Sequence, residues 1–283
     1  MLSYRHAFHA GNHADVLKHM VLCAGLQHAT RKETPLFYLD THAGAGQYRL
    51  NSVEAERTGE ALEGILKLDL QSMLNAVSAQ SKQMLESYIS TVQPWLLRKQ
   101  YPGSPLLAAS MLRRNDHLHL FELHEAEFSM LQRHMQDDDR VQMTLADGFK
   151  NSLALLPPVQ KRAVVLIDPP YEIKDDYIRA AELAARIHGR MPGAQILIWY
   201  PVVRRGDVGR LLDKLRHGSI RDLWQFEFGL KPDDEVYGMT ASGMLVINPP
   251  WTLPDVMREC LPLLQQALAP LQGHWKVENL LAE

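Results

Sequence analysis

Short apolar runs, several of them ending in an acidic residue, alternate with helix-like segments along this chain. The apolar runs predict buried strands at 36–40, 117–122, 141–147, 163–171 and 194–201. Helical spacing predicts helices at 12–29, which Asn12 can cap, and at 124–135, 174–190, 205–216 and 254–269. This alternation is typical of an α/β fold with a mostly parallel sheet. Residues 243–251 predict an antiparallel hairpin at the edge of that sheet.

The connection between the first two predicted strands is longer than a single crossover helix requires. It spans residues 41–116, and within it residues 49–102 are rich in Leu, Met, Gln and Ser at helical spacing. We therefore predict an inserted helical subdomain at 49–102, with 1–48 and 103–283 forming the main domain. Insertions in such sheets lie at the carboxyl ends of strands, where ligands bind. The segment is either a substrate-contacting element or a packing and lid element.

The composition, with 46% hydrophobic and 22% charged residues, is that of an ordinary globular protein. A net charge of −3 excludes a surface coated in basic charge, although residues 1–32 and 202–217 are locally basic. The two cysteines, Cys23 and Cys260, cannot form a disulfide framework, which favours a reducing compartment. A polar N-terminus predicts no signal peptide, and no apolar run is long enough for a membrane span. We expect a cytoplasmic monomer.

A glycine turn follows the first strand in the sequence Asp40-Thr-His-Ala-Gly-Ala-Gly, where Gly44 and Gly46 let the backbone approach a ligand closely. The turn lacks the third glycine of a dinucleotide-binding motif, and the absence of Gly-Lys-Ser/Thr excludes a P-loop. Glu122 closes the second strand, where an acid accepts hydrogen bonds from ribose hydroxyls. Asp147-Gly148 closes the third, where a carboxylate can accept a bond from an adenine amino group. Ribose and adenine without a pyrophosphate indicate S-adenosyl-L-methionine.

Asp168-Pro169-Pro170-Tyr171 follows the most apolar strand. Proline has no N–H, so the two prolines form a rigid, non-helical exit with exposed carbonyls. The Asp168 carboxylate and the Pro169 carbonyl would accept hydrogen bonds from adenine N6 and direct its lone pair toward a methyl sulfonium. Asp168 can also take the released proton. Tyr171 offers a face on which a flipped base stacks. The motif predicts methylation of a planar exocyclic amine.

Five motifs together resemble the bacterial 23S ribosomal RNA adenine-N6 methyltransferase J family. They are YRHAFHAGNHADVLKH (4–19), DTHAGAGQY (40–48), YPGSP (101–105), LIDPPYE (166–172) and SGMLVINPPW (242–251). The resemblance implies a Rossmann-like class I methyltransferase fold, S-adenosyl-L-methionine as cofactor and 23S ribosomal RNA as partner. It also implies methylation of adenine N6.

The resemblance further implies roles for individual residues. Asp168 would be the catalytic acceptor, together with Pro169 and Tyr171 of its motif. Tyr4 would touch the RNA, and we expect Arg5 beside it to do the same. The cofactor would lie against Asp168 and against Lys18, His19, His42, Gly44, Ser104, Glu122, Asp147 and Gly148.

Other interpretations stay open at this point. A DNA adenine-N6 methyltransferase would use the same chemistry, and a non-catalytic nucleic-acid-binding protein in the use of external DNA could keep the fold. The N-terminal histidines suggest a metal site, yet only His9 and His13 are four residues apart, and no Glu or Cys is close by. We therefore predict an RNA-facing, hydrogen-bonding segment and no metal.

Overall fold

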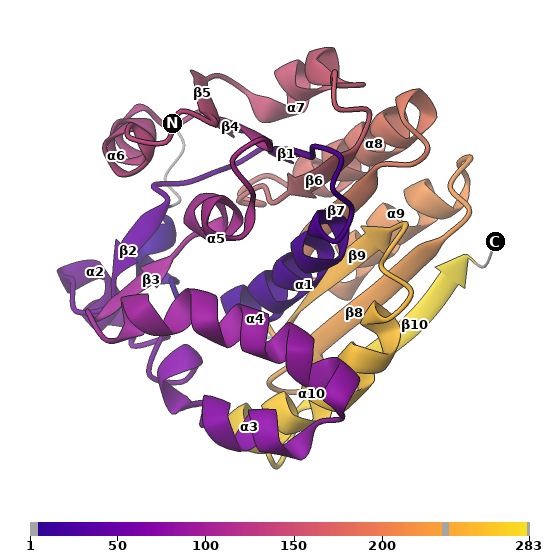
Figure 1. Cartoon of the computed structure of the whole chain (residues 1–283). Helices are drawn as coiled ribbons and strands as arrows, with labels where there is room; N and C mark the ends of the chain where they lie inside the picture. Colours follow the sequence, from indigo (N-terminus) through magenta and orange to yellow (C-terminus); the bar gives the residue numbers. More distant parts are fainter. Residues whose placement is uncertain (1–4, 234–237, 282–283) are drawn as a thin grey trace.

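The computed structural model describes residues 5–233 and 238–281. Within these residues, eight strands form one sheet in the order β10-β8-β9-β7-β6-β1-β4-β5 (Figure 1). Five neighbouring strands are parallel and confirm the predicted strands: β7 (Gln195–Val202), β6 (Ala163–Ile167), β1 (Phe37–Asp40), β4 (His117–Glu122) and β5 (Val141–Leu145). Their carboxyl ends therefore meet at one edge of the sheet.

The antiparallel part of the sheet is wider than the predicted hairpin. β8 (Leu223–Gly229) and β9 (Ala241–Ile247) pair antiparallel, and β9 lies between β7 and β8. β10 (His274–Leu281) pairs with β8 and forms the outer edge. The antiparallel edge is confirmed, whereas β8 and β10 are strands that the sequence patterns did not predict.

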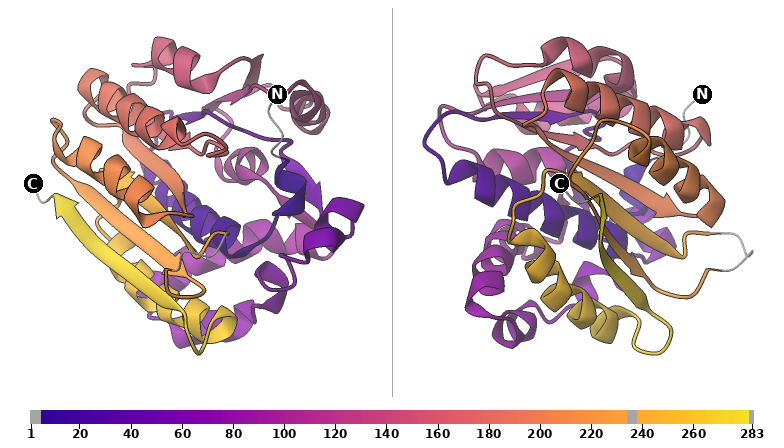
Figure 2. Two further views of the ribbon diagram at one scale, coloured as in Figure 1. Left: turned by 180° about the vertical axis from the view of Figure 1, so that it is seen from behind. Right: turned by 90° about the vertical axis from the view of Figure 1, so that its right-hand side faces the viewer.

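Helices cover both faces of the sheet (Figure 2). The helices on one face are α1 (His13–Thr30), α4 (Ala79–Leu96), α5 (Ser104–Met111), α6 (Glu125–Met135) and α10 (Leu253–Leu268). The helices on the other are α7 (Gly148–Asn151), α8 (Asp175–Arg190) and α9 (Arg205–Arg216). Alternate residues of a strand point to opposite faces, so Leu166 of β6 joins the first core and Val165 joins the second. No described helix is long and apolar enough to cross a membrane.

Helix α1 is buried on every side. Asn12 caps it as predicted, because its side chain accepts a hydrogen bond from the Asp15 N–H at 2.9 Å. Every residue from 13 to 26 is buried, since α1 is packed between the sheet and the helices α4, α5 and α10. This enclosure carries the polar side chains of the helix, Lys18 among them, into the interior.

Most of the segment 49–102 is helical, with strand residues at its two ends. After strand β2 (Gln47–Arg49) the chain forms α2 (Val53–Thr58), a 3-10 turn (Ile65–Lys67), α3 (Leu70–Ala76), α4 and strand β3 (Gln100–Pro102), which pairs with β2. Leu85 and Tyr88 of α4 belong to the same core as α1. Ser78, the cap of α4, donates from its Oγ to Glu259 of α10 at 2.7 Å. The segment thus shares a core with the main domain, and its status as a separate unit stays a prediction.

Replacing Leu22 by Ala should lower the free energy of unfolding by about 2–5 kcal/mol, because Leu22 is fully buried in the all-round packing of α1. Urea denaturation measures the loss. Leu97→Ala is the matched control: Leu97 is 82% exposed and its replacement should change stability by less than about 0.5 kcal/mol. Equal effects of the two substitutions would contradict the buried position of α1.

Candidate active site

A cavity of about 500 Å³ lies at the carboxyl ends of the parallel strands. The predicted site residues that line it are Lys18, His19, His42, Gly44, Ser104, Glu122, Asp147, Gly148, Asp168, Pro169 and Tyr171. The structure thus brings residues as far apart in the sequence as Lys18 and Tyr171 into one site, while their individual roles stay predictions. Tyr4 lies outside the described residues. Arg5 lies apart from the cavity lining, and its guanidinium pairs with Glu54 at 3.1 Å.

The glycine turn after β1 is held against the end of β4. The N–H of Gly44 donates to Glu122 Oε2 at 2.8 Å, and the N–H of His124 donates to Glu122 Oε1 at 2.7 Å. Gly44 has φ +62°, and a Cβ there would collide with the Tyr48 hydroxyl, so the turn requires glycine. Burial raises the pKa of Glu122 above its ordinary value. This carboxylate keeps lone pairs for a further donor in the cavity.

The loop after β5 packs directly on the end of β1. Asp147 caps the short helix α7 by accepting from the Phe149 N–H at 2.9 Å, and Arg179 of α8 donates to its Oδ2 at 2.9 Å. A Cβ at Gly148 would overlap the Thr41 carbonyl. Glycine is therefore needed there for the two loops to meet, and the contact holds Asp147 at the cavity.

Asp40, which ends β1, lies behind the cavity wall. It is fully buried and accepts from the Tyr38 hydroxyl at 2.9 Å and from Ser104 Oγ at 2.7 Å. Burial raises the pKa of Asp40 to about 6, although these hydrogen bonds oppose the shift. Asp40 therefore positions the turn and Ser104 from behind.

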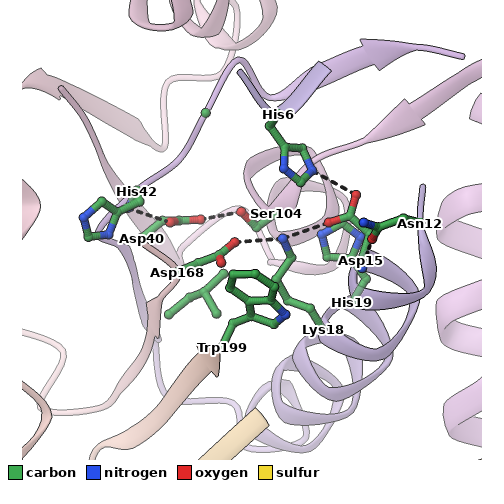
Figure 3. A network of polar contacts seen from close by, with 12 residues as sticks. His6, Asn12, Asp15, Lys18, His19, Asp40, His42, Ser104, Asp168 and Trp199 are labelled. Carbon is green, nitrogen blue, oxygen red and sulfur yellow. Dashed lines mark hydrogen bonds and ion pairs between the residues drawn. The ribbon is translucent and has the colours of Figure 1, made fainter. Parts of the chain in front are cut away.

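A buried ammonium links helix α1 to the Asp-Pro-Pro-Tyr motif. Lys18 Nζ lies 2.8 Å from Asp15 Oδ1 and 2.7 Å from Asp168 Oδ2 (Figure 3). Burial alone would lower the pKa of Lys18, but the two carboxylates raise it above its ordinary value. His6 Nε2 lies 2.9 Å from Asp15 Oδ2, and His6 and Lys18 together keep the pKa of Asp15 well below its usual range despite burial. Asp168 is therefore held in one orientation by a charged partner.

Two residues beside Lys18, Asp15 and Trp199, were not predicted from the sequence. Asp15 lies one helical turn before Lys18, a spacing that itself predicts an ion pair. Trp199 of β7 lines the cavity, and Lys18 Nζ lies 5.8 Å from the centre of its ring. A tryptophan inside an apolar strand carries no local signal of a site, so its place became visible only in the fold.

The end of the Asp-Pro-Pro-Tyr motif adopts a strained backbone. Tyr171 has φ +53°, a region that non-glycine residues rarely occupy. Its hydroxyl donates to the Trp199 carbonyl, and its ring lies 4.5 Å from the Tyr177 ring and 5.7 Å from the Trp199 ring. These contacts fix the Tyr171 ring in the cavity wall.

Two cavity histidines are neutral. Burial lowers the pKa of both His19 and His42 to about 3. His19 Nδ1 lies 3.0 Å from the Tyr101 hydroxyl, and His42 Nδ1 lies 2.8 Å from Thr41 Oγ1. Each ring therefore acts through hydrogen bonding and shape and carries no charge at neutral pH.

Glu60 of the segment 49–102 binds two residues of the N-terminal motif at 4–19. Its carboxylate lies 2.8 Å from His9 Nδ1 and accepts from Asn12 Nδ2 at 2.9 Å. The hydrogen bond with Glu60 raises the pKa of His9 above its ordinary value. Burial by itself would raise the pKa of Glu60, but the hydrogen bonds from His9 and Asn12 lower it below its ordinary value. The Gly11 carbonyl also accepts from the Ile65 N–H at 2.8 Å. The described residues contain no group of three or more His, Cys, Asp or Glu side chains that could hold a metal ion.

The fold and this site together define a Rossmann-like methyltransferase: a doubly wound sheet with a glycine turn after β1, acids at β4 and β5, and Asp-Pro-Pro-Tyr after β6. The model of the family described as "Ribosomal RNA large subunit methyltransferase D, RlmJ" matches residues 33–281. The chain belongs to this family.

Named relatives match over the whole length. Ribosomal RNA large subunit methyltransferase J of Escherichia coli (strain K12) is 46% identical over 287 residues, and that of Haemophilus influenzae (strain Rd) is 44% identical over 284 residues; each match covers 100% of both chains. The crystal structure of protein LPL1258 from Legionella pneumophila has a TM-score of 0.86 at 34% identity, covering 96% of this chain and 98% of that one. Membership makes the protein an enzyme and implies a methyl donor of the S-adenosylmethionine type.

Glu60→Gln should destabilise the protein more at pH 6 than at pH 9. The pKa of His9 is raised above 6.5 in the folded state. The stabilisation that the charged His9–Glu60 pair provides is therefore complete below pH 6.5. It is lost as pH rises through the pKa of His9 in the folded protein. The lowered pKa of Glu60 keeps its carboxylate charged across this window. Urea denaturation at both pH values measures the difference.

The control for this substitution is Glu63→Gln. The Glu63 side chain is 73% exposed and pairs with Lys67 at the surface, so its replacement should have little effect at either pH. A loss of stability in Glu60→Gln that is the same at pH 6 and pH 9 would contradict a charged His9–Glu60 pair.

Proposed function

We propose that this protein transfers a methyl group from S-adenosyl-L-methionine to N6 of one adenine in 23S ribosomal RNA, after that base flips into a pocket at Asp168, Pro169 and Tyr171. The observation that carries the proposal is the Lys18–Asp168 pair at 2.7 Å on the wall of the cavity. It presents an oriented carboxylate directly after a buried parallel strand. The relatives named as ribosomal RNA large subunit methyltransferases support the choice of RNA.

The residues of the cavity fit such a methyl donor. The volume of about 500 Å³ is in the range of small-molecule sites. Buried Nε2 of His19 and Nε1 of Trp199 have no hydrogen-bond partner in the described part of the chain, and both residues line the cavity. Such groups call for a polar ligand. Glu122 would accept from the ribose and Asp147 from the adenine, with Lys18, His19, His42, Gly44, Ser104, Gly148 and Asp168 completing the site.

When bound, the donor supplies an electrophilic methyl carbon on a positively charged sulfur. The lone pair of adenine N6 is delocalised into the ring, which makes it a poor nucleophile. Lys18 binds Asp168 through Oδ2, so Oδ1 is the oxygen that would accept an N6–H bond. The Pro169 carbonyl would accept the second N6–H. These two acceptors would localise the lone pair, and Asp168 would take the proton that N6 loses.

Two aromatic rings would hold the flipped base. Tyr171 and Trp199 line the cavity in edge-to-face contact, with ring centres 5.7 Å apart. Stacking of a base on such a ring is worth about 1–3 kcal/mol. The energy offsets part of the cost of extracting the adenine from its neighbours. Tyr4 and Arg5 would contact the RNA outside this pocket, and a ribosomal RNA substrate would make the protein cytoplasmic.

Asp168→Ala should lower the rate of methyl transfer by at least about a thousandfold, because it removes both the N6 acceptor and the partner of Lys18. Binding of S-adenosyl-L-methionine, measured by calorimetry, should weaken far less than the rate falls, because the other cofactor-side residues remain. The matched control is Asp255→Asn, whose side chain is 65% exposed on α10. Near-normal turnover by Asp168→Ala would refute the acceptor role.

Substrate choice is tested with the unaltered enzyme. Naked 23S ribosomal RNA fragments and duplex DNA are incubated with labelled S-adenosyl-L-methionine, and mass spectrometry locates the methyl group. We expect N6-methyladenine at one position of the RNA. Preferential labelling of the duplex would replace the proposal with a DNA adenine-N6 methyltransferase.

A further inference from the structure

Alternate residues of β7 lead from Trp199 outward along the wall of the cavity. Trp199, Pro201 and Val203 all line it, because side chains two positions apart in a strand share one face. The strand runs toward the carboxyl edge of the sheet, so Val203, which directly follows β7, lies furthest out. Pro201 is buried, whereas Val203 is 42% exposed. An apolar side chain therefore reaches solvent at the outer end of the cavity wall.

The main chain is anchored on both sides of residues 203–204. The Val202 carbonyl accepts from the N–H of Thr240 at 2.9 Å. Arg205 donates through Nε to Asp233 at 2.7 Å, and Thr240 Oγ1 donates to the same carboxylate at 3.2 Å. Both partners belong to the connection between β8 and β9. Residues 203–204 therefore lie between two fixed points, and neither side chain takes part in these contacts.

A buried carboxylate strengthens the second of these anchors. Glu227 of β8 is fully buried, and it accepts from Arg205 Nη1 at 2.7 Å and from the Tyr200 hydroxyl at 2.8 Å. Removing Arg205 would leave this carboxylate buried without its cation, which is strongly unfavourable. Arg205 is thus committed to the structure of the loop, whereas its neighbour Arg204 is not.

The stretch 202–217 is locally basic, and the structure shows which of its arginines are available to an anion. Three cations are bonded to acids: Arg205 to Glu227 and Asp233, Arg210 to Asp207, and Lys214 to Glu182. Arg204 and Arg216 are exposed, and their guanidinium groups have no hydrogen-bond or ion-pair partner among the described residues. They stand at opposite ends of α9, which has 12 residues and is therefore about 18 Å long. Only Arg204 adjoins the cavity.

We propose that residues 203–204 hold the RNA strand beside the flipped adenine, with Arg204 binding a phosphate of an adjoining nucleotide and Val203 packing against the base next to the gap. A planar guanidinium matches the geometry of phosphate oxygens. Apolar side chains fill the space between bases when a protein unstacks them. The loop is fixed before the RNA arrives, so holding the strand costs little further ordering. This inference rests on the proposed function, because a strand lies here only if the cavity accepts one of its bases.

The phosphate contact is tested by Arg204→Gln, with Arg216→Gln as the matched control. Binding and methylation of a 23S ribosomal RNA fragment are measured at several salt concentrations. Arg204→Gln should weaken binding about tenfold and change kcat by less than about threefold, because it removes a charge-assisted hydrogen bond that holds the strand. The slope of log affinity against log salt should become shallower by about 0.7–0.9, the value for one phosphate. Arg216→Gln should change neither quantity.

The apolar contact is tested by Val203→Ser. Val159→Ser is the control, since Val159 is 91% exposed and precedes β6 at the opposite edge of the sheet. The fragment carries 2-aminopurine at the methylated position, where its fluorescence rises when the base leaves the stack. Val203→Ser should reduce the rise on binding at least about threefold, and Val159→Ser should leave it unchanged. Urea denaturation checks that every variant is folded.

The outcomes separate this inference from the proposed function. Equal RNA affinity of Arg204→Gln and Arg216→Gln, in an enzyme that methylates the fragment, would overturn the phosphate contact alone. An equal fluorescence rise in Val203→Ser and Val159→Ser would overturn the apolar contact. An unaltered protein that leaves ribosomal RNA unmethylated would instead refute the proposed function, and this inference with it.

Discussion

A lysine ammonium buried between two carboxylates governs the arrangement of this active site. Taking Lys18 out of water is costly, and its contacts with Asp15 at 2.8 Å and Asp168 at 2.7 Å offset that cost. One carboxylate comes from α1 and the other from the loop after β6, so the contact joins parts of the chain 150 residues apart. Because α1 is enclosed on all sides, the packing of that helix determines where the ammonium lies.

Some polar side chains around the cavity are charged, and others are neutral. Lys18 and Asp15 stabilise each other's charge, whereas burial lowers the pKa of His19 and of His42 to about 3. Neutral rings offer directed hydrogen bonds without repelling a positively charged ligand. The proposed sulfonium donor would benefit from this separation, since an additional cation beside it would weaken its binding.

The segment 49–102 supports the site through hydrogen bonds to residues that line the cavity. The sequence left a substrate-contacting role and a packing or lid role open. The structure adds two direct supports, because Glu60 holds His9 and Asn12 while Tyr101 holds His19. Glu60 belongs to none of the sequence motifs, and the YPGSP motif that Tyr101 begins gave no sign of its partner. Each acquires its importance from a partner far away in the chain, at a separation of 51 residues for His9 and Glu60 and 82 for His19 and Tyr101.

Local pattern was sufficient for the five parallel strands, the capped helix α1 and the strand-end residues of the cavity, because apolar period, turn glycines and strand-ending acids depend on near neighbours. Lys18, His19, His42 and Ser104 were expected at the site only from the resemblance to a known family. Local pattern failed for β8, whose Gln225 and Glu227 are buried. Glu227 accepts hydrogen bonds from Tyr200 and Arg205, and Gln225 donates to Tyr200, so their partners come from other elements. The same reason explains why the sequence did not show that Trp199 lines the cavity or that two carboxylates pair with Lys18. Contacts between distant segments arise only when the chain packs, so no window of sequence contains them.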